Sequence, residues 1–288
     1  MTWQILLGLN LITGTVRETF NKKIANKTDP FVMLFYLVVF GFLWLYPYHL
    51  IATGTYPRFN LMATLPGIIF TVSFVAYLSA IRISLSQTIL FQSYSILVTI
   101  FLTAVYLGEG KYFDVATVSG LKVIIGIILA IVSLWFLLHV GRKKEELLER
   151  RWFLYILLVI FFGGTGSFLS IWFLTNSTPQ EMIINQSYSM FILLFVLIKI
   201  YRKKLLIGNK ATLLIFVSSF FASIAVVSFY EVLKQVAVSK ILPVQQVSLV
   251  VLTMLSAVIF YKESNIFSGR RLIGMVMGLV GIIMLVTS

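Results

Sequence analysis

The sequence predicts an all-α membrane protein with ten transmembrane helices, arranged as two inverted five-helix repeats. Three observations predict this fold class. Apolar residues make up 59% of the 288-residue chain and charged residues only 11%, whereas about 25% of residues are charged in soluble domains. The chain contains apolar runs of about 20 residues, which is the length of a membrane-spanning helix. Its second half also repeats a motif of its first half.

The composition excludes a soluble enzyme and a disordered chain, because so few charges cannot cover so much apolar surface. The chain has no cysteine, so disulfides and thiolate chemistry are excluded. Its two histidines, His49 and His139, lie far apart at the ends of apolar runs. We find no nucleophile elbow, P-loop, catalytic carboxylate pair or metal-ligand cluster. The sequence therefore predicts neither enzyme activity nor a cofactor.

The apolar runs predict the spans in order. We expect the first run to be retained as a helix, since it lacks the basic start and the small-residue cleavage site of a signal peptide. The connections are too short to hold a soluble domain. The ten predicted spans cover residues 2–24, 30–52, 61–81, 85–107, 116–140, 152–175, 180–201, 211–233, 241–261 and 269–287.

The net charge of +13 follows the predicted topology. Seventeen of the 23 Lys and Arg residues lie in odd-numbered connections and four in even-numbered ones. Because basic residues collect in short cytoplasmic loops, this bias places the odd-numbered connections in the cytoplasm and both termini outside. Binding of nucleic acid would instead require one basic face with base-reading chemistry, so we exclude it.

The internal repeat is clearest in the last two spans of each half. Four residues recur with the same spacings and a constant offset of 154 positions: Gln92, Thr99, Glu109 and Gly120 in the first half, and Gln246, Thr253, Glu263 and Gly274 in the second. Each half holds five spans, an odd number, so the second half enters the bilayer from the opposite face. We expect residues 1–140 and 152–288 to form the two repeats, joined by a basic connection at 141–151.

These motifs resemble the EamA branch of the drug/metabolite transporter superfamily. The residues that carry the resemblance are the pairs Gly108-Glu109 and Lys262-Glu263, the glycines Gly120 and Gly274, and the loop residues Thr28-Asp29-Pro30 and Thr178-Pro179. The resemblance implies a ten-span metabolite transporter with its cavity among spans one, three, four, six, eight and nine. Members of this family commonly keep both termini in the cytoplasm, whereas the charge distribution here places them outside.

Polar side chains within spans mark candidate binding residues, because a polar group in hydrocarbon is costly unless it faces protein or water. One such face combines Thr88, Gln92, Ser95, Thr99 and Thr103 in the fourth span. Gln246 and Thr253 begin the equivalent face in the ninth span, with Gln245 beside it. These groups fit either a cavity wall or hydrogen bonds between helices. We expect the two glutamines of these faces, Gln92 and Gln246, to line the cavity, and Gln245 remains a further candidate beside them.

Charged residues within spans are the second group of candidates. In the first span Asn10 and Arg17 share a face, with Glu18 adjacent. Arg17 and Glu18 fit an internal ion pair, a substrate clamp, or the interfacial end of the helix. In the eighth span Glu231 lies beside Tyr230 and three residues before Lys234. Among these, Glu231 is the first candidate for a proton-coupling or substrate-binding carboxylate.

Aromatic residues are 15% of the chain, and a few lie deep in the spans, among them Tyr77, Tyr94 and Trp172. Aromatic faces near a carboxylate would suit an amine or a quaternary ammonium group. Elsewhere, Gly274 and Gly278 form a G-x-x-x-G pair in the tenth span that fits either packing within the chain or a dimer face.

These observations predict a secondary transporter of a small polar or amphiphilic metabolite, working by alternating access. Its partners would be the lipid bilayer, a small-molecule substrate and, as candidate coupling ion, the proton. With no ATP-binding segment, the driving force would be a proton gradient or the gradient of the substrate. The alternative is an intramembrane scaffold or partner subunit without transport.

Overall fold

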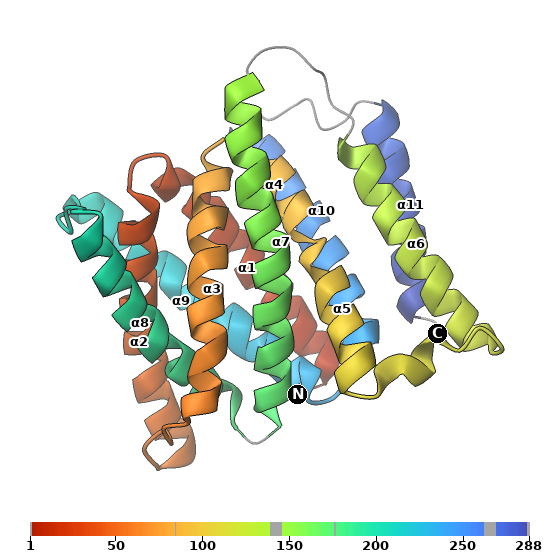
Figure 1. Ribbon diagram of the computed structural model, residues 1–288, viewed down its shortest axis with the longest axis horizontal. Helices are drawn as coiled ribbons and strands as arrows, with labels where there is room; N and C mark the ends of the chain where they lie inside the picture. The colour runs from red at the N-terminus through yellow and green to blue at the C-terminus, as the bar shows by residue number, and fades with distance from the viewer. Residues whose placement is uncertain (1, 84, 139–145, 176, 262–268, 287–288) are drawn as a thin grey trace.

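The computed structural model describes residues 2–83, 85–138, 146–175, 177–261 and 269–286, and these residues form helices and no strand (Figure 1). The α-helices are α1 (Trp3–Ala25), α2 (Pro30–Thr53), α3 (Leu61–Ile81), α4 (Leu85–Gln92), α5 (Ser95–Tyr106), α6 (Val118–Leu138), α7 (Glu146–Leu174), α8 (Pro179–Ile200), α9 (Asn209–Leu233), α10 (Val238–Tyr261) and α11 (Gly269–Val286). A short 3-10 helix, η1 (Glu109–Phe113), joins α5 to α6.

Helices α2 and α8 begin with the same local chemistry. Asp29 caps α2 by accepting a hydrogen bond from the backbone N–H of Phe31 at 3.0 Å, and Pro30 occupies the first helical position. Thr178 and Glu181 form a reciprocal capping box at the start of α8, with Pro179 at the first position. Proline suits this position because a backbone N–H there would have no acceptor within the helix, so its absence costs no hydrogen bond. The two related loop sequences therefore perform the same function.

The fourth predicted span is not one continuous helix. It is divided into α4 and α5 by a break at Ser93 and Tyr94. Across the break, the backbone N–H of Tyr94 bonds to the carbonyl of Phe91 and that of Ile96 to the carbonyl of Ser93, which are i to i+3 bonds. This tighter winding differs from the α-helical pattern. The single polar face predicted from α-helical spacing is therefore interrupted.

Close helix contacts are made at small residues. A side chain at Gly164 of α7 would meet the Ser95 carbonyl and Val98 of α5, and one at Gly67 of α3 would meet the backbone of Gln186 in α8. Helix α3 packs against α7 and α8, while α1 and α2 both pack against α9. Helices α6 and α11 pair with each other at one side of the molecule (Figure 1). There Gly278 faces Ser133, which supports the packing interpretation of the tenth-span glycines.

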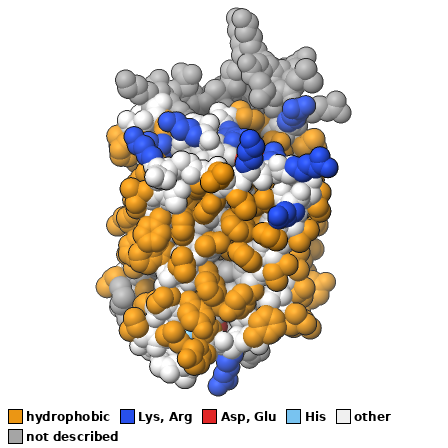
Figure 2. All heavy atoms as spheres, turned by 90° about the vertical axis from the view of Figure 1, so that its left-hand side faces the viewer, with side chains coloured by type: hydrophobic (Ala, Val, Ile, Leu, Met, Phe, Trp, Pro, Cys, Tyr) orange, Lys and Arg blue, Asp and Glu red, His pale blue; other side chains and the backbone are white. Residues whose placement is uncertain are grey.

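In the face seen in Figure 2 the surface is a broad apolar belt, and Lys and Arg side chains gather at one end of it. Six helical segments of the described chain are long and apolar enough to cross a membrane, namely α2, α3, α8, α9, Arg151–Leu174 of α7 and Lys240–Tyr261 of α10. Two basic residues also hold the helix ends together. Lys22 of α1 donates to the Ile81 carbonyl at 2.6 Å, and Arg82 donates to the Ala25 carbonyl at 2.6 Å.

The largest buried apolar cluster lies where α1 and α3 end and α2 and α9 begin. Its members include Ile24, Met33, Ile81, Leu194 and Ile215. Smaller clusters lie toward the opposite ends of these helices, for example around Leu7 and Val232. Between these regions the helices leave space for a cavity.

Candidate functional site

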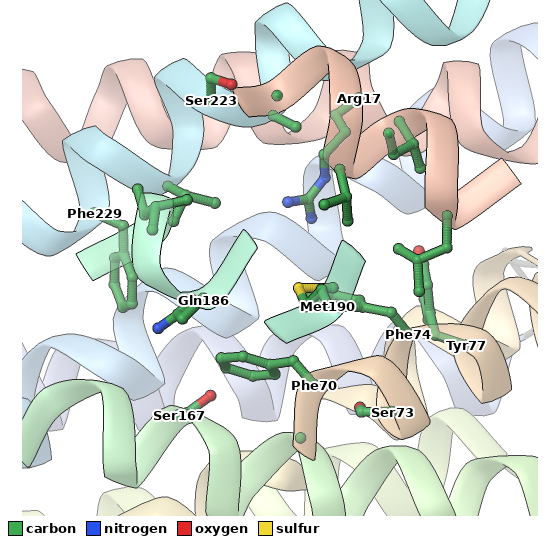
Figure 3. Close-up of a pocket in the computed structure, with 18 of the residues that line it drawn as sticks. Arg17, Phe70, Ser73, Phe74, Tyr77, Ser167, Gln186, Met190, Ser223 and Phe229 are labelled. Carbon is green, nitrogen blue, oxygen red and sulfur yellow. The ribbon is translucent and has the colours of Figure 1, made fainter. Parts of the chain in front are cut away.

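A cavity of about 290 Å³ lies within the helix bundle (Figure 3). It is lined by α1, α2, α3, α4, α5, α7, α8, α9 and α10, which include all six spans that the family resemblance implies, together with α2 and α8. Its volume is near the lower end of the range for small-molecule sites. The polar residues that line it are Arg17, Glu18, Asn21, Ser73, Tyr77, Gln92, Ser95, Ser167, Gln186, Ser187, Ser219, Ser223, Tyr230 and Gln246.

Four of these residues form a charged cluster, consisting of Arg17, Glu18, Asn21 and Tyr77. Arg17 donates from Nε to the Glu18 Oε1 atom at 2.8 Å, and its Nη2 atom contacts the same oxygen. The Tyr77 hydroxyl donates to Glu18 Oε2, and the Asn21 amide lies 3.5 Å from that oxygen. Both oxygens of the buried carboxylate are therefore engaged by protein groups. The charge pair is compensated within the cluster, as a buried carboxylate requires.

A neutral cluster, consisting of Ser170, Gln186 and Tyr230, lies elsewhere in the bundle. The Gln186 amide donates to the Ser170 hydroxyl at 2.9 Å, and the Tyr230 hydroxyl interacts with both of these side chains. Gln186 and Tyr230 line the cavity, whereas Ser170 is completely buried behind them. This cluster carries hydroxyl and amide groups but no charge.

The break between α4 and α5 brings two of the predicted residues into the cavity. Gln92 ends α4, Ser95 begins α5, and both line the cavity, as does Gln246 of α10. The outer members of the predicted polar face have other roles. Thr88 accepts a hydrogen bond from Trp152, and Thr99 donates to the Gly164 carbonyl at 3.0 Å. One part of the predicted polar face therefore lines the cavity, and another part forms hydrogen bonds between helices.

The structure brings seven of the twelve candidate residues to the cavity, namely Arg17, Glu18, Tyr77, Gln92, Ser95, Tyr230 and Gln246. Asn10 and Gln245 instead join helices. The Asn10 amide donates to the Ala225 carbonyl at 2.8 Å and its oxygen accepts from Gln245 at 3.1 Å. These bonds link α1 to α9 and α10.

The other three candidates also lie outside the cavity lining. The Tyr94 hydroxyl approaches the Ile131 carbonyl of α6 at 3.4 Å. Trp172 is 40% exposed and packs against Phe168 and Tyr106 on the outside of the bundle. Glu231 is partly buried but does not line the cavity. The cavity carboxylate is therefore Glu18 of α1.

Several lining residues were absent from the predicted set. Asn21 and Gln186 complete the two clusters, and serines such as Ser73, Ser167 and Ser223 line the walls. One available signal was helical spacing, because Ser219 and Ser223 are four residues apart and Ser73 precedes Tyr77 by four. Serine also bonds to the preceding turn of its own helix, as Ser223 does to the Ser219 carbonyl at 2.9 Å. A serine in a span is therefore a weak indicator of a cavity.

Glu109, which belongs to the repeated motif in the first half of the chain, has a structural role. It accepts a hydrogen bond from the backbone N–H of Val238 at 3.2 Å and so caps the start of α10. Its repeat counterpart Glu263 lies outside the described residues. Among the described residues, no group of three or more His, Cys, Asp or Glu side chains could hold a metal ion.

Comparison with known proteins agrees with the resemblance found in the sequence. Residues 150–287 match the EamA-like transporter family. No curated protein matches the chain. A solved crystal structure with 13% sequence identity is similar over 96% of this chain and 95% of its own, with a TM-score of 0.72, and so shares the fold. This match over the second half of the chain supports membership in the drug/metabolite transporter superfamily, and the long apolar helices indicate an integral, multi-pass membrane protein.

Proposed function

We propose that this protein is a secondary transporter that moves a small polar or amphiphilic metabolite, an amino acid or an amine-type solute, across the cell membrane. The observation that carries this proposal is the cavity, which is lined by helices from residues 1–140 and from residues 152–288. A binding site shared by two halves is what alternating access requires, because rocking of the halves can expose it to either side. The family match over residues 150–287 supports the same class of function.

The packing of the helices supports an inverted repeat of five plus five spans, with α4 and α5 together forming the fourth. Exchanging the halves pairs α1 with α7, α2 with α8, and α3 with α9. Under this exchange the contact of α1 with α9 becomes that of α7 with α3, and the contact of α2 with α9 becomes that of α8 with α3. All four contacts are present, and α6 packs against its own counterpart α11. The broken α4–α5 segment beside the cavity is also typical of transporters.

The distribution of charge supports an orientation with the basic end in the cytoplasm and both termini outside. Lys and Arg side chains gather at one end in Figure 2, and both chain termini lie toward the other end in Figure 1. Because the chain lacks cysteine, single cysteines can report the orientation. In intact cells we expect Thr55→Cys to react with a membrane-impermeant maleimide and Lys204→Cys to react only after permeabilisation. The reverse pattern would contradict this orientation.

Transport is tested by counterflow in proteoliposomes loaded with panels of amino acids, amines, sugars and simple carboxylates. We expect saturable uptake of at least one labelled solute. The driving force would be a proton gradient or the gradient of the solute, and an imposed pH difference distinguishes them. Uptake that responds to the pH difference supports proton coupling.

A pair of variants on α7 links uptake to the cavity. Ser167 lines the cavity, so Ser167→Trp should fill it and abolish uptake. Phe161 is 61% exposed on the same helix, so Phe161→Trp should leave uptake unchanged. If no solute in the panels is exchanged, the alternative of a non-transporting scaffold or partner subunit replaces transport.

A further inference from the structure

The Arg17 guanidinium keeps hydrogen-bond donors available on the side that faces the cavity. Arginine has five N–H donors, and Arg17 directs its Nε and Nη2 atoms to Glu18. In the described part of the chain, its Nη1 atom donates to no protein acceptor. The side chain is 19% exposed, and Figure 3 shows the guanidinium pointing into the cavity.

Glu18 differs from Arg17 in both exposure and bonding. Its side chain is only 2% exposed, and its two oxygens are engaged by Arg17, Tyr77 and Asn21. A solute in the cavity would therefore meet the N–H donors of Arg17 before it could reach the carboxylate. Because Glu18 also holds the guanidinium through two of its nitrogens, the free edge of that group is fixed in orientation. Such preorganisation favours binding.

The rest of the described lining carries no other charged side chain. Its remaining polar groups are amides and hydroxyls such as Gln186 and Gln246, and its walls include the rings of Phe70, Phe74 and Phe229. Glu18 already neutralises the charge of Arg17, and the free edge of the guanidinium, formed by Nη1 and the remaining N–H of Nη2, can donate to one further carboxylate in a bidentate arrangement. A phosphate dianion would need further cations, and an ammonium group would face a cation with no available carboxylate.

We infer that the cavity selects organic monocarboxylates with an apolar body, and that Arg17 binds their carboxylate group. This inference rests on the proposed function and narrows its substrate class. Of the two solute classes proposed above, an amino acid carries the required carboxylate and a simple amine does not; the ammonium group of an amino acid would have to be bound by the neutral amides and hydroxyls of the lining. Phe70, Phe74 and Phe229 would contact the apolar body, and the neutral amides would bind its other polar atoms.

Binding to the detergent-purified protein tests the inference with matched compounds. The probes are phenylacetate, phenylacetamide and phenethylamine, together with hexanoate and hexanamide, and the readouts are thermal shift and calorimetric titration. We expect at least one carboxylate to bind about tenfold more tightly than its amide, the difference of a charged hydrogen-bonded contact. We expect no binding of the amine. If no carboxylate binds more tightly than its amide, the inference is wrong.

Variants then assign the preference to Arg17. Because Arg17→Gln leaves Glu18 without its cation, the main variant is the neutral double substitution Arg17→Gln with Glu18→Gln. We expect it to lose the preference for carboxylate over amide while it still binds the amide within about threefold of the wild type. Arg17→Lys keeps the charge but lacks the planar fork, so its preference should be intermediate. Arg58→Gln, at an exposed loop position outside the cavity, is the matched control and should bind like the wild type.

The outcomes separate this inference from the proposed transport function. Saturable counterflow of amines or sugars, without carboxylates, would support transport and overturn the inference. Carboxylate binding that depends on Arg17, without counterflow of any solute, would support the inference and overturn transport. An unchanged carboxylate preference in the double variant would overturn the role of Arg17.

Discussion

The charged cluster of Arg17, Glu18, Asn21 and Tyr77 and the neutral cluster of Ser170, Gln186 and Tyr230 occupy related places in the two halves of the chain. Asn21 lies nine residues before Pro30 of α2, and Ser170 lies nine residues before Pro179 of α8. Tyr77 lies four residues before the end of α3, and Tyr230 lies three residues before the end of α9. In each cluster a tyrosine hydroxyl contacts polar groups of the partner helices.

The difference between the clusters is their charge. By the same count from the prolines, the counterparts of Arg17 and Glu18 are Gly166 and Ser167. A side chain at Gly166 would meet the ring of Phe70 at 2.9 Å, so an arginine could not fit there without rearrangement. A repeated scaffold can therefore hold a site whose charge lies in one half only. In the transport function proposed above, the repeated scaffold would supply the symmetry that alternating access needs, and the unmatched residues would supply selectivity.

The largest expected effect is a loss of stability, which should be greater for a substitution in the charged cluster than for one in the neutral cluster. Glu18→Gln leaves the Arg17 cation without its carboxylate, so we expect the free energy of unfolding to fall by about 3 kcal/mol. Gln186→Leu in the neutral cluster should cost about 1 kcal/mol. Unfolding in detergent micelles measures both. Adding Arg17→Gln to Glu18→Gln should recover much of the loss, and equal stability of the single and double variants would contradict the ion-pair interpretation.

A smaller effect is expected from removing the matched tyrosine hydroxyls. Tyr77 donates to a carboxylate, so Tyr77→Phe should lower the free energy of unfolding by about 2 kcal/mol. Tyr230 contacts only neutral partners, so Tyr230→Phe should lower it by about 1 kcal/mol. The same unfolding assay compares the two variants. Equal losses would show that the charge of Glu18 adds nothing to the contact.

A still smaller effect is expected from the Asn10–Gln245 pair, which lies outside both clusters. A double-mutant cycle of Asn10→Leu and Gln245→Leu should give a coupling energy of about 0.6 kcal/mol, as for other hydrogen bonds between membrane helices. Asn10→Leu should cost more than Gln245→Leu, because Asn10 also bonds to Ala225. Binding of phenylacetate should be unaffected in both variants. A loss of binding without a loss of stability would place the pair in the site.

The smallest expected effect is that of Glu231→Gln. Glu231 does not line the cavity, so this variant should bind and exchange solutes within about twofold of the wild type. Glu18→Gln, the matched change at the cavity carboxylate, should alter both. These measurements use the titration and counterflow assays described above. Abolished binding in Glu231→Gln would instead restore Glu231 as the functional carboxylate.

The membrane character and the helix ends could be predicted from the sequence because they depend on local properties. Apolar length predicts spans, and the observed helices α2, α3, α8 and α9 follow the predicted ranges closely. Proline after Asp29 or Thr178 predicts helix starts, because capping involves only neighbouring residues. The break at Ser93 and Tyr94 was missed. No proline or glycine marks it in the sequence.

The candidate site was likewise predictable only as far as it depends on local properties of the sequence. Arg17, Glu18, Gln92 and Gln246 were identified because polar groups within spans are rare and need a reason. Glu231 was proposed for the same reason, but it does not line the cavity. The sequence does not determine which of several neighbouring helices a side chain faces.

The sequence by itself determined a helical membrane protein, the bounds of several of its long apolar helices, and the short list of polar residues within the predicted spans. These properties follow from hydrophobic length and local capping, which are independent of the neighbouring helices. Only the tertiary structure decided that Asn10 bonds to Gln245, that Glu18 is enclosed by Tyr77 and Asn21, and that Arg17 faces the cavity. Those contacts join residues far apart in the chain, so they depend on how the helices pack against one another.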